Sequence, residues 1–154
     1  MRCAVVTVSD TRTETTDASG RAIAELLAAQ GHTIAHRVIV PDDAQGIGAV
    51  LDEVLGREDI DVVLTTGGTG ITARDGTYEV VSARLEKRLD GFGELFRMLS
   101  YADVGPAAML SRACAGLARG RIVVAMPGSE AAVRLAMDKL LLPEIAHMVR
   151  EARR

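Results

Sequence analysis

The chain has 154 residues, of which 48% are apolar and 25% charged, and its formal net charge is −3. This composition is typical of one globular domain over residues 1–154, and it argues against a disordered or membrane-embedded chain. Aromatic residues make up only 3% and Lys and Arg are scattered, which argues against a nucleic-acid-binding surface.

The first apolar run, residues 3–8, is rich in valine and ends at Ser9-Asp10, so it predicts a buried strand. The run is too short for a secretory signal, and no run reaches the ~18 apolar residues of a membrane-spanning helix. We therefore expect a cytoplasmic protein. Cys3 and Cys114 form neither a disulfide framework nor a zinc-binding pattern, and we expect both to be buried.

Strand and helix signals alternate along the first half of the chain. Two further β-branched strands are predicted over 33–40 and 61–66. Helical spacing of apolar residues predicts helices from Ser19-Gly20 up to Gly31, over 47–55 and over 77–85. This alternation predicts a parallel sheet with helices on both faces.

The second half begins with a less regular stretch, where a helix is predicted near 94–99 and a loop around Gly105-Pro106. Residues 112–117 and 121–125 predict two strands around a glycine turn at 118–120, an antiparallel addition at a sheet edge. Ser129 is expected to cap a helix that carries apolar residues from 133 to 141, and Pro143 to begin a last helix. The fold class is therefore α/β, a three-layer α/β/α sandwich with a mostly parallel sheet and a short antiparallel edge hairpin.

Four methionines have a simple structural interpretation as gap fillers in the core. They are Met98, Met109, Met126 and Met137.

Small and polar residues follow each predicted strand. In an open parallel sheet, ligands bind beyond the carboxyl ends of the strands, where loops meet and helices begin. The segments at those ends are 9–12, 41–43, 67–75 and 126–129. We therefore expect the functional site there.

The loop Gly67-Gly68-Thr69-Gly70 is the clearest candidate for a phosphate-binding element. Glycines let backbone N–H groups approach an anion closely, and the following helix N-terminus adds a favourable field. The loop is neither a dinucleotide-binding fingerprint nor a Walker loop, because no Lys follows Gly70. A tight turn is the alternative interpretation.

Asp42 and Asp75 lie in the same group of segments. Mg²⁺ is usually held by one or two carboxylates together with substrate phosphates, so this pair suggests metal-assisted chemistry. Each aspartate alone has a simpler interpretation as a turn residue, Asp42 after Pro41 and Asp75 before Gly76. Ser111 and Arg112 form a further pair that suits anionic oxygens.

Several motifs, taken in order, resemble the MogA/MoaB family of molybdenum cofactor biosynthesis proteins, and the resemblance covers nearly the whole chain. Its specificity comes from the order and spacing of the motifs. They are VVTVSDTR at 5–12, DASG at 17–20, TGGTGIT at 66–72, RD at 74–75, GFGE at 91–94, SRA at 111–113 and MPGS at 126–129.

The resemblance implies transfer of AMP from ATP to molybdopterin, which depends on Mg²⁺ and yields adenylyl-molybdopterin and pyrophosphate. It implies that Asp42 and Asp75 are catalytic and support the metal. It places Ser9, Asp10 and Thr11 toward the pterin. The nucleotide and phosphates would be bound by Gly67, Gly68, Thr69, Gly70, Ser111, Arg112, Met126, Pro127, Gly128 and Ser129.

The resemblance also implies assembly and partners. Family members form trimers or hexamers, and residues 91–99 are our expected contact in such an oligomer. The expected ligands are ATP, molybdopterin and Mg²⁺, and a downstream molybdenum-insertion protein is a candidate partner.

Two departures leave the activity open. Many relatives have a proline shortly after the aspartate, where this chain has Asp75-Gly76-Thr77-Tyr78. Residues 96–100, FRMLS, resemble the MoaB side of the family, in which some members are catalytically idle. The alternative function is therefore a non-catalytic molybdopterin-binding or carrier protein. A Rossmann dehydrogenase is disfavoured by the missing Gly-x-Gly-x-x-Gly.

Overall fold

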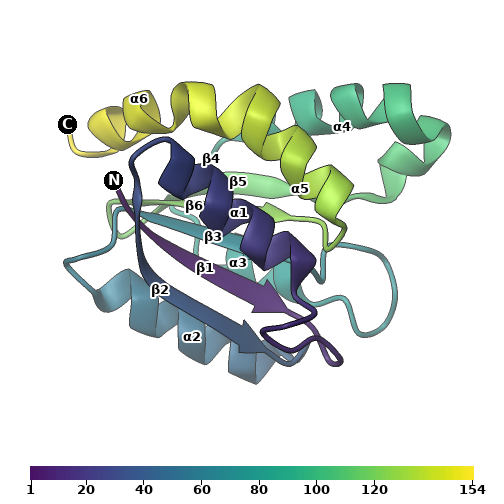
Figure 1. Cartoon of the computed structure of the whole chain (residues 1–154), viewed down its shortest axis with the longest axis horizontal. Coiled ribbons are helices and arrows are strands. Elements are labelled where there is room, and N and C mark those ends of the chain that lie inside the picture. Colours follow the sequence, from purple (N-terminus) through teal and green to yellow (C-terminus); the bar gives the residue numbers. More distant parts are fainter.

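A six-stranded sheet with the order β2-β1-β3-β6-β5-β4 forms the middle layer of the computed structural model, which describes residues 1–154 (Figure 1). Strands β2, β1, β3 and β6 run parallel, whereas β5 and β4 are antiparallel to their neighbours. The strands are β1 Arg2–Val8, β2 Thr33–Val40, β3 Val62–Thr66, β4 Lys87–Arg88, β5 Cys114–Ala118 and β6 Arg121–Met126.

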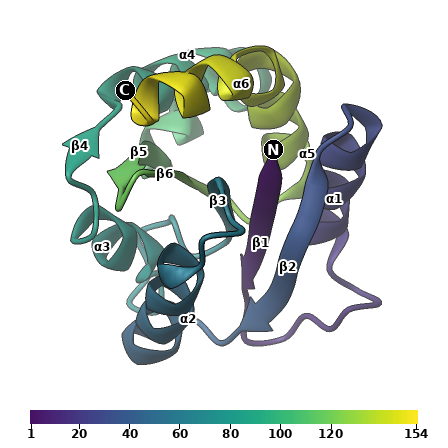
Figure 2. The ribbon, with the colours of Figure 1, turned by 90° about the vertical axis from the view of Figure 1, so that its left-hand side faces the viewer.

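Helices cover both faces of this sheet (Figure 2), which confirms the predicted three-layer fold. The α-helices are α1 Ala18–Ala29, α2 Ala44–Gly56, α3 Thr77–Ser82, α4 Asp90–Val104, α5 Glu130–Ala136 and α6 Leu142–Ala152. A 3₁₀ segment, η1 Gly105–Leu110, follows α4, and a π-helical turn, η2 Met137–Leu141, joins α5 to α6. No helix is long and apolar enough to cross a membrane.

Alternation along the strands divides the core into two layers. Cys3 and Val5 of β1 pack with α1, α4, α5 and α6 on one face. Ala4, Val6 and Val8 pack with α2 and α3 on the other. Because successive side chains of a strand point to opposite faces, a strand covered on both faces is apolar throughout. The central strands are accordingly mostly apolar in the sequence, and the threonines within them, Thr7, Thr65 and Thr66, are also buried.

The carboxyl ends of the parallel strands lie in register. Thr7 of β1 is opposite Thr66 of β3, and Thr66 is opposite Met126 of β6. Val8 is opposite Val40 of β2. The loops that follow these four strands therefore leave the sheet at one edge, as the sequence predicted.

The hairpin differs in detail from its predicted position. Strand β6 pairs in parallel with β3 and is interior, so the antiparallel part of the sheet consists of β5 and β4. Its turn, Arg119-Gly120, has positive φ at both residues, as a type I′ hairpin turn requires. Strand β5 starts at the edge where β6 ends, since Cys114 is opposite Ala125. Ser111 and Arg112 are thereby brought to that edge.

Helix α4 is longer than predicted, and the expected loop after it is the 3₁₀ segment η1. Phe92, Phe96 and Ser100 of α4 face the core, but Leu95 and Tyr101 are exposed and largely apolar. Apolar residues on two faces of one helix weaken the 3.6-residue pattern from which helices are predicted.

The same region accounts for a wrong prediction about methionine. Met98 and Met109 are 62% and 75% exposed, so they do not fill the core, whereas Met126 and Met137 are fully buried as expected. Residue type alone does not separate a core methionine from one on an apolar surface. Cys3 and Cys114 are buried free thiols, which confirms their predicted role.

Candidate functional site

A cavity of about 550 Å³ opens at the carboxyl ends of β1, β3 and β6. Its walls come from the end of β1, the glycine loop, the segment after β6 and the end of η1. It is lined by Thr7, Val8, Ser9, Arg12, Ser19, Thr66, Gly67, Gly68, Thr69, Gly70, Asp75, Leu110, Ser111, Pro127, Gly128 and Ser129. Most of these residues are small or hydroxylated, so the cavity presents polar groups and backbone to a ligand.

The glycine loop requires glycine at its first two positions. Gly67 and Gly68 have φ of 100° and 71°, in the left-handed region that side chains with a Cβ rarely adopt. A Cβ at Gly67 would lie 2.2 Å from the carbonyl oxygen of Val8, and one at Gly68 would lie 2.2 Å from Oγ1 of Thr77. The chain therefore turns sharply at the end of β3 in close contact with β1 and α3.

Hydrogen bonds to its carbonyl groups hold the glycine loop in place. The N–H of Thr77 donates to the Gly68 oxygen at 3.1 Å, and the N–H of Arg112 donates to the Thr69 oxygen at 3.0 Å. The amides of Gly68 and Thr69 make no hydrogen bond within the chain. A loop with fixed carbonyls and free N–H donors at a cavity wall is suited to an anionic ligand.

The segment after β6 closes the other side of this cavity. The Pro127 carbonyl accepts a hydrogen bond from Oγ1 of Thr66 at 2.8 Å, and Ser129 caps α5 by accepting from the N–H of Ala132. The side chain of Met126 is fully buried in the core, and its carbonyl accepts from the N–H of Gly67. Met126 therefore holds the glycine loop and does not line the cavity.

Asp75 lies in the cavity wall at the end of the glycine segment. Its Oδ2 accepts hydrogen bonds from the N–H and Oγ1 of Thr72, at 2.8 and 2.7 Å. Burial raises the pKa of Asp75, but these bonds and one from the Gly70 amide outweigh burial and lower it overall. Asp75 is therefore an ionised carboxylate at neutral pH.

Asp42 lies behind the loop and is absent from the cavity lining. Its Oδ1 accepts from the N–H of Gly76 at 3.3 Å, and its Oδ2 lies 3.1 Å from the position of a Cβ at Gly68. Burial raises the pKa of Asp42, and the nearby carboxylates of Asp75 and Asp10 raise it further.

The negative charges of Asp42 and Asp75 act on each other, which is the feature that a metal ion shared by the two carboxylates would use. Their charges repel each other, and Oδ2 of Asp42 accepts no hydrogen bond within the chain. The guanidinium of Arg74 already offsets part of this repulsion, and a cation bound between the two carboxylates would offset more. No group of three or more His, Cys, Asp or Glu side chains is placed to hold a metal, so the remaining ligands would be water or substrate oxygens, as is usual for Mg²⁺.

Ser111 and Arg112 link the start of β5 to the loop. The hydroxyl of Ser111 is buried, has no hydrogen-bond partner and belongs to a residue that lines the cavity. Arg112 does not line the cavity; its Nε donates to the carbonyl of Gly70 at 2.9 Å and its Nη2 to that of Asp75 at 3.2 Å. Arg112 also pairs with Glu79. These contacts tie Arg112 to the loop.

The residues assigned to the pterin are only partly at the cavity. Ser9 lines it, and its Oγ accepts from the N–H groups of Thr11 and Arg12. Asp10 forms a bidentate ion pair with Arg74, and neither Asp10 nor Thr11 is in the cavity lining.

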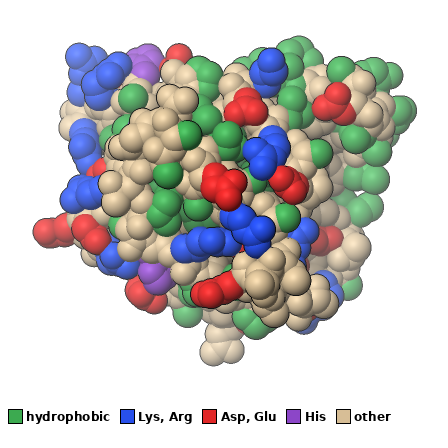
Figure 3. Space-filling model, viewed as in Figure 1, with side chains coloured by type: hydrophobic (Ala, Val, Ile, Leu, Met, Phe, Trp, Pro, Cys, Tyr) green, Lys and Arg blue, Asp and Glu red, His purple; other side chains and the backbone are tan.

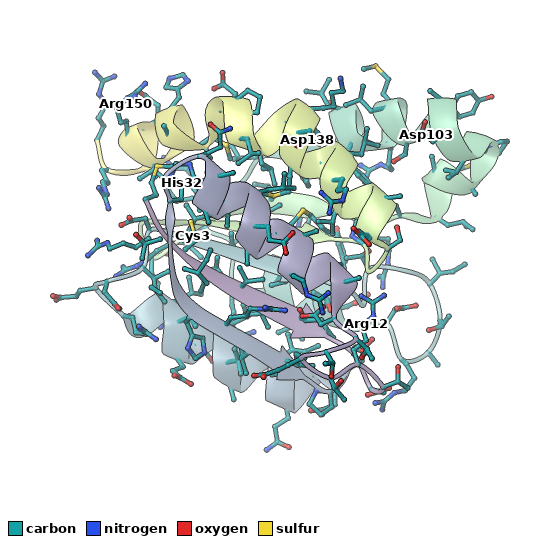
Figure 4. The ribbon with its side chains drawn as sticks, in the orientation of Figure 1. Cys3, Arg12, His32, Asp103, Asp138 and Arg150 are labelled. Carbon is teal, nitrogen blue, oxygen red and sulfur yellow. The ribbon has the colours of Figure 1, made fainter.

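A cluster of charged residues around Asp17, which includes Arg12, was not predicted from the sequence. Arg12 lines the cavity beyond the end of β1 (Figure 4) and donates to Oγ of Ser19. The fully buried Asp17 lies 3.9 Å from Arg12 and 3.1 Å from Arg37, and accepts from Oγ1 of Thr7. Asp17 also caps α1. The sequence carries no signal for this cluster, because Arg12 lies in a loop and Arg37 is distant from Asp17 in the sequence.

These features define an α/β domain that has a cavity beside a glycine loop at the carboxyl ends of its parallel strands. Residues 4–147 match the model of the family described as a probable molybdopterin binding domain. The chain therefore belongs to this family of molybdenum cofactor biosynthesis proteins, as the sequence motifs indicated.

Relatives on the MoaB side are particularly similar. Molybdenum cofactor biosynthesis protein B of Bacillus anthracis is 56% identical over 100% of this chain and 92% of the relative. A crystal structure of a molybdenum cofactor biosynthesis protein B superimposes with a TM-score of 0.96 at 54% identity, covering 99% of this chain and 95% of the other. The tungsten cofactor synthesizing protein MoaB from Pyrococcus furiosus has a TM-score of 0.89 at 40% identity, covering 99% and 97%.

Proposed function

We propose that this protein transfers AMP from ATP to molybdopterin in a reaction that depends on Mg²⁺. The observation that carries the proposal is the glycine loop, whose Gly68 and Thr69 amides are free at the wall of the cavity that Asp75 also lines. Free N–H donors beside an ionised carboxylate suit a ligand that is both a phosphate chain and a metal complex.

In this reaction the terminal phosphate of molybdopterin attacks the α-phosphorus of ATP in line. The new P–O bond forms as the bond between the α-phosphorus and the bridging oxygen breaks, and pyrophosphate leaves with the electron pair. When bound, Mg²⁺ would neutralise the negative charge on the leaving pyrophosphate. The loop amides donate hydrogen bonds to the phosphate oxygens, and Arg112 keeps the loop in position through the Gly70 carbonyl.

No nucleophilic side chain takes part in this mechanism. Cys3 and Cys114 are buried, and burial raises the pKa of each thiol, to about 11 for Cys3. Neither thiol is therefore available to form a covalent enzyme intermediate.

We propose that the protein works as a homo-oligomer, a trimer or a hexamer built from trimers. Exposed apolar side chains gather over α4 and η1 (Figure 3). Residues 91–99, the expected contact, form part of α4. They are Leu95, Met98, Tyr101, Val104, Met109 and Leu110. Contiguous apolar patches of this kind mark protein contacts in soluble proteins.

A molybdopterin-binding protein without catalysis is the second candidate, favoured by the high identity to MoaB proteins. Incubation with molybdopterin, Mg²⁺ and ATP labelled at the α-phosphate separates the two. Transfer of the label to molybdopterin with release of pyrophosphate supports the enzyme. Binding of molybdopterin with no label transferred, alongside an active MogA-type control, would reject it in favour of the carrier.

A further inference from the structure

A second cavity, of about 340 Å³, lies on the other side of Ser111 and Arg112 from the first. It is formed between the first half of α4 and the start of β5, with Tyr78 of α3 at its wall. Three arginines line it, Arg88, Arg97 and Arg112, against one carboxylate, Asp90. The proposed adenylyl transfer makes no use of this cavity.

The three guanidinium groups differ in how far their charge is neutralised. Arg112 pairs with Glu79. Arg88 donates to the hydroxyl of Tyr78 at 2.8 Å and lies 3.5 Å from Asp90, a largely exposed carboxylate. A surface pair of this kind contributes little free energy.

Arg97 has no carboxylate partner. Its Nη1 donates to the carbonyls of Ser111 and Ala113, at 3.3 and 3.2 Å, and it forms no ion pair. Gly93 allows this placement, since a Cβ there would lie 2.8 Å from Nη2 of Arg97 and 2.7 Å from the Ala113 oxygen. A half-buried guanidinium is thus fixed at the cavity wall with its charge uncompensated.

Donors and stacking complete the cavity. The guanidinium carbons of Arg88 and Arg112 lie 5.6 and 5.1 Å from the centre of the Tyr78 ring, which restrains both side chains. Ser111 lines both cavities, and its hydroxyl is buried without a partner. Restrained guanidinium groups at a cavity wall are the donors that a tetrahedral oxyanion requires.

We propose that this second cavity is an anion site, which binds a tetrahedral oxyanion of the phosphate type, either free or as the phosphate group of a small molecule. Its volume accommodates the anion with a few further atoms. Because Arg112 contacts both this cavity and the carbonyl of Gly70, an anion here is also adjacent to the support of the glycine loop.

Crystals soaked in selenate locate such a site directly, since selenium scatters anomalously. We expect a peak within hydrogen-bond distance of the Arg97 guanidinium, separate from any peak at the glycine loop. A peak at the glycine loop alone, no peak, or a side chain of a second copy filling the cavity would each overturn the proposal.

Calorimetric titration with orthophosphate tests the same site in solution. Arg97→Gln should weaken this binding at least about tenfold, because a charged hydrogen-bond donor is lost. Arg97→Lys should restore part of it, and the exposed Arg150→Gln, which removes the same charge elsewhere, should leave it unchanged. Equal affinity in Arg97→Gln and Arg150→Gln would overturn the proposal.

Arg97 also supports backbone carbonyls, so Arg88→Gln is the second variant, since it removes only side-chain contacts. It should weaken phosphate binding at least about threefold, as expected for one partly neutralised cation. Parallel titrations with glycerol 3-phosphate identify the source of the anion. Tighter binding of the ester than of orthophosphate would indicate a phosphorylated small molecule, and the reverse a free ion. The proposal is refuted if Arg97→Gln and Arg88→Gln, both folded, bind both ligands as the wild type does.

Discussion

The guanidinium Nε of Arg112 donates a hydrogen bond to the carbonyl oxygen of Gly70 at 2.9 Å, and so joins the start of β5 to the glycine loop. The same side chain reaches the carbonyl of Asp75 and the carboxylate of Glu79. Within one trans peptide unit the C=O and the N–H point in opposite directions, so a carbonyl held on one side of the loop leaves the next amide facing the other side. Arg112 supplies much of that support.

The first prediction is that Arg112→Gln lowers the affinity for Mg-ATP by at least about tenfold, since charged hydrogen bonds that position the loop are lost. Calorimetric titration measures this. Arg134→Gln is the control, because Arg134 pairs only with Glu130 on the surface of α5. An unchanged affinity in Arg112→Gln would show that the loop does not need this support.

The second prediction concerns Gly68. Gly68→Ala should lower the free energy of unfolding by about 1–3 kcal/mol, because φ is +71° and the new Cβ would meet Thr77. Gly56→Ala is the matched control at the end of α2, where nothing lies within 4 Å, and it should be neutral or slightly stabilising. Urea denaturation of both variants measures the difference, and equal stability would contradict the loop geometry.

The third prediction separates function from stability at Asp42. Burial raises the pKa of this carboxyl, so its ionised form costs folding free energy. The wild type therefore loses stability as pH rises from the unfolded pKa, about 3.9, through the raised folded value. Asp42→Asn should be more stable than the wild type at pH 7 and equally stable at low pH, but should bind Mg²⁺ more weakly in the presence of ATP. Lower stability at pH 7 with unchanged Mg²⁺ binding would assign Asp42 a purely structural role.

The fourth prediction concerns Asp61, outside the site. This buried carboxyl accepts from the N–H and guanidinium of Arg2, at 2.8 and 2.9 Å, and pairs with Arg153 near the C-terminus. Burial raises the pKa of Asp61, but the hydrogen bonds and charges of these arginines lower it overall. The stability that ionised Asp61 contributes to the fold is therefore fully present above the pKa of the unfolded chain, about 3.9. It is lost as the pH falls through the lower pKa of the folded protein.

Asp61→Asn should therefore cost about 1–3 kcal/mol at pH 7 and flatten the acid limb of the stability profile. Unfolding monitored from pH 7 down to pH 2 measures both effects. An acid limb as steep as that of the wild type would show that other carboxylates control acid unfolding.

The parts of the fold that were predictable are those with one unambiguous signal. Strand β3 followed by Gly67 and Gly68 carries such a signal, because a strand buried on both faces is rich in apolar and β-branched residues and left-handed backbone favours glycine. Helix α4 carries two apolar faces, and its extent could not be predicted.

The sequence predicted where the site lies in the fold better than it predicted which side chains line the cavity. The register of β1, β3 and β6 aligns their carboxyl ends, so the segments named from the sequence do meet. Which atoms line the cavity depends on pairings between distant residues. The ion pair of Asp10 with Arg74 and the contact of Arg12 with Ser19 follow no periodicity, and they decide which side chains line the cavity.

The most direct test of the proposed adenylyl transfer is a single-turnover measurement with wild type and Asp75→Asn side by side, each saturated with molybdopterin and Mg-ATP. We expect the wild type to form adenylyl-molybdopterin and one equivalent of pyrophosphate. We expect folded Asp75→Asn to be slower by at least about a hundredfold, the scale for removing one electrostatic contact to a transition state. No product with the wild type, or an equal rate with Asp75→Asn, would contradict the mechanism.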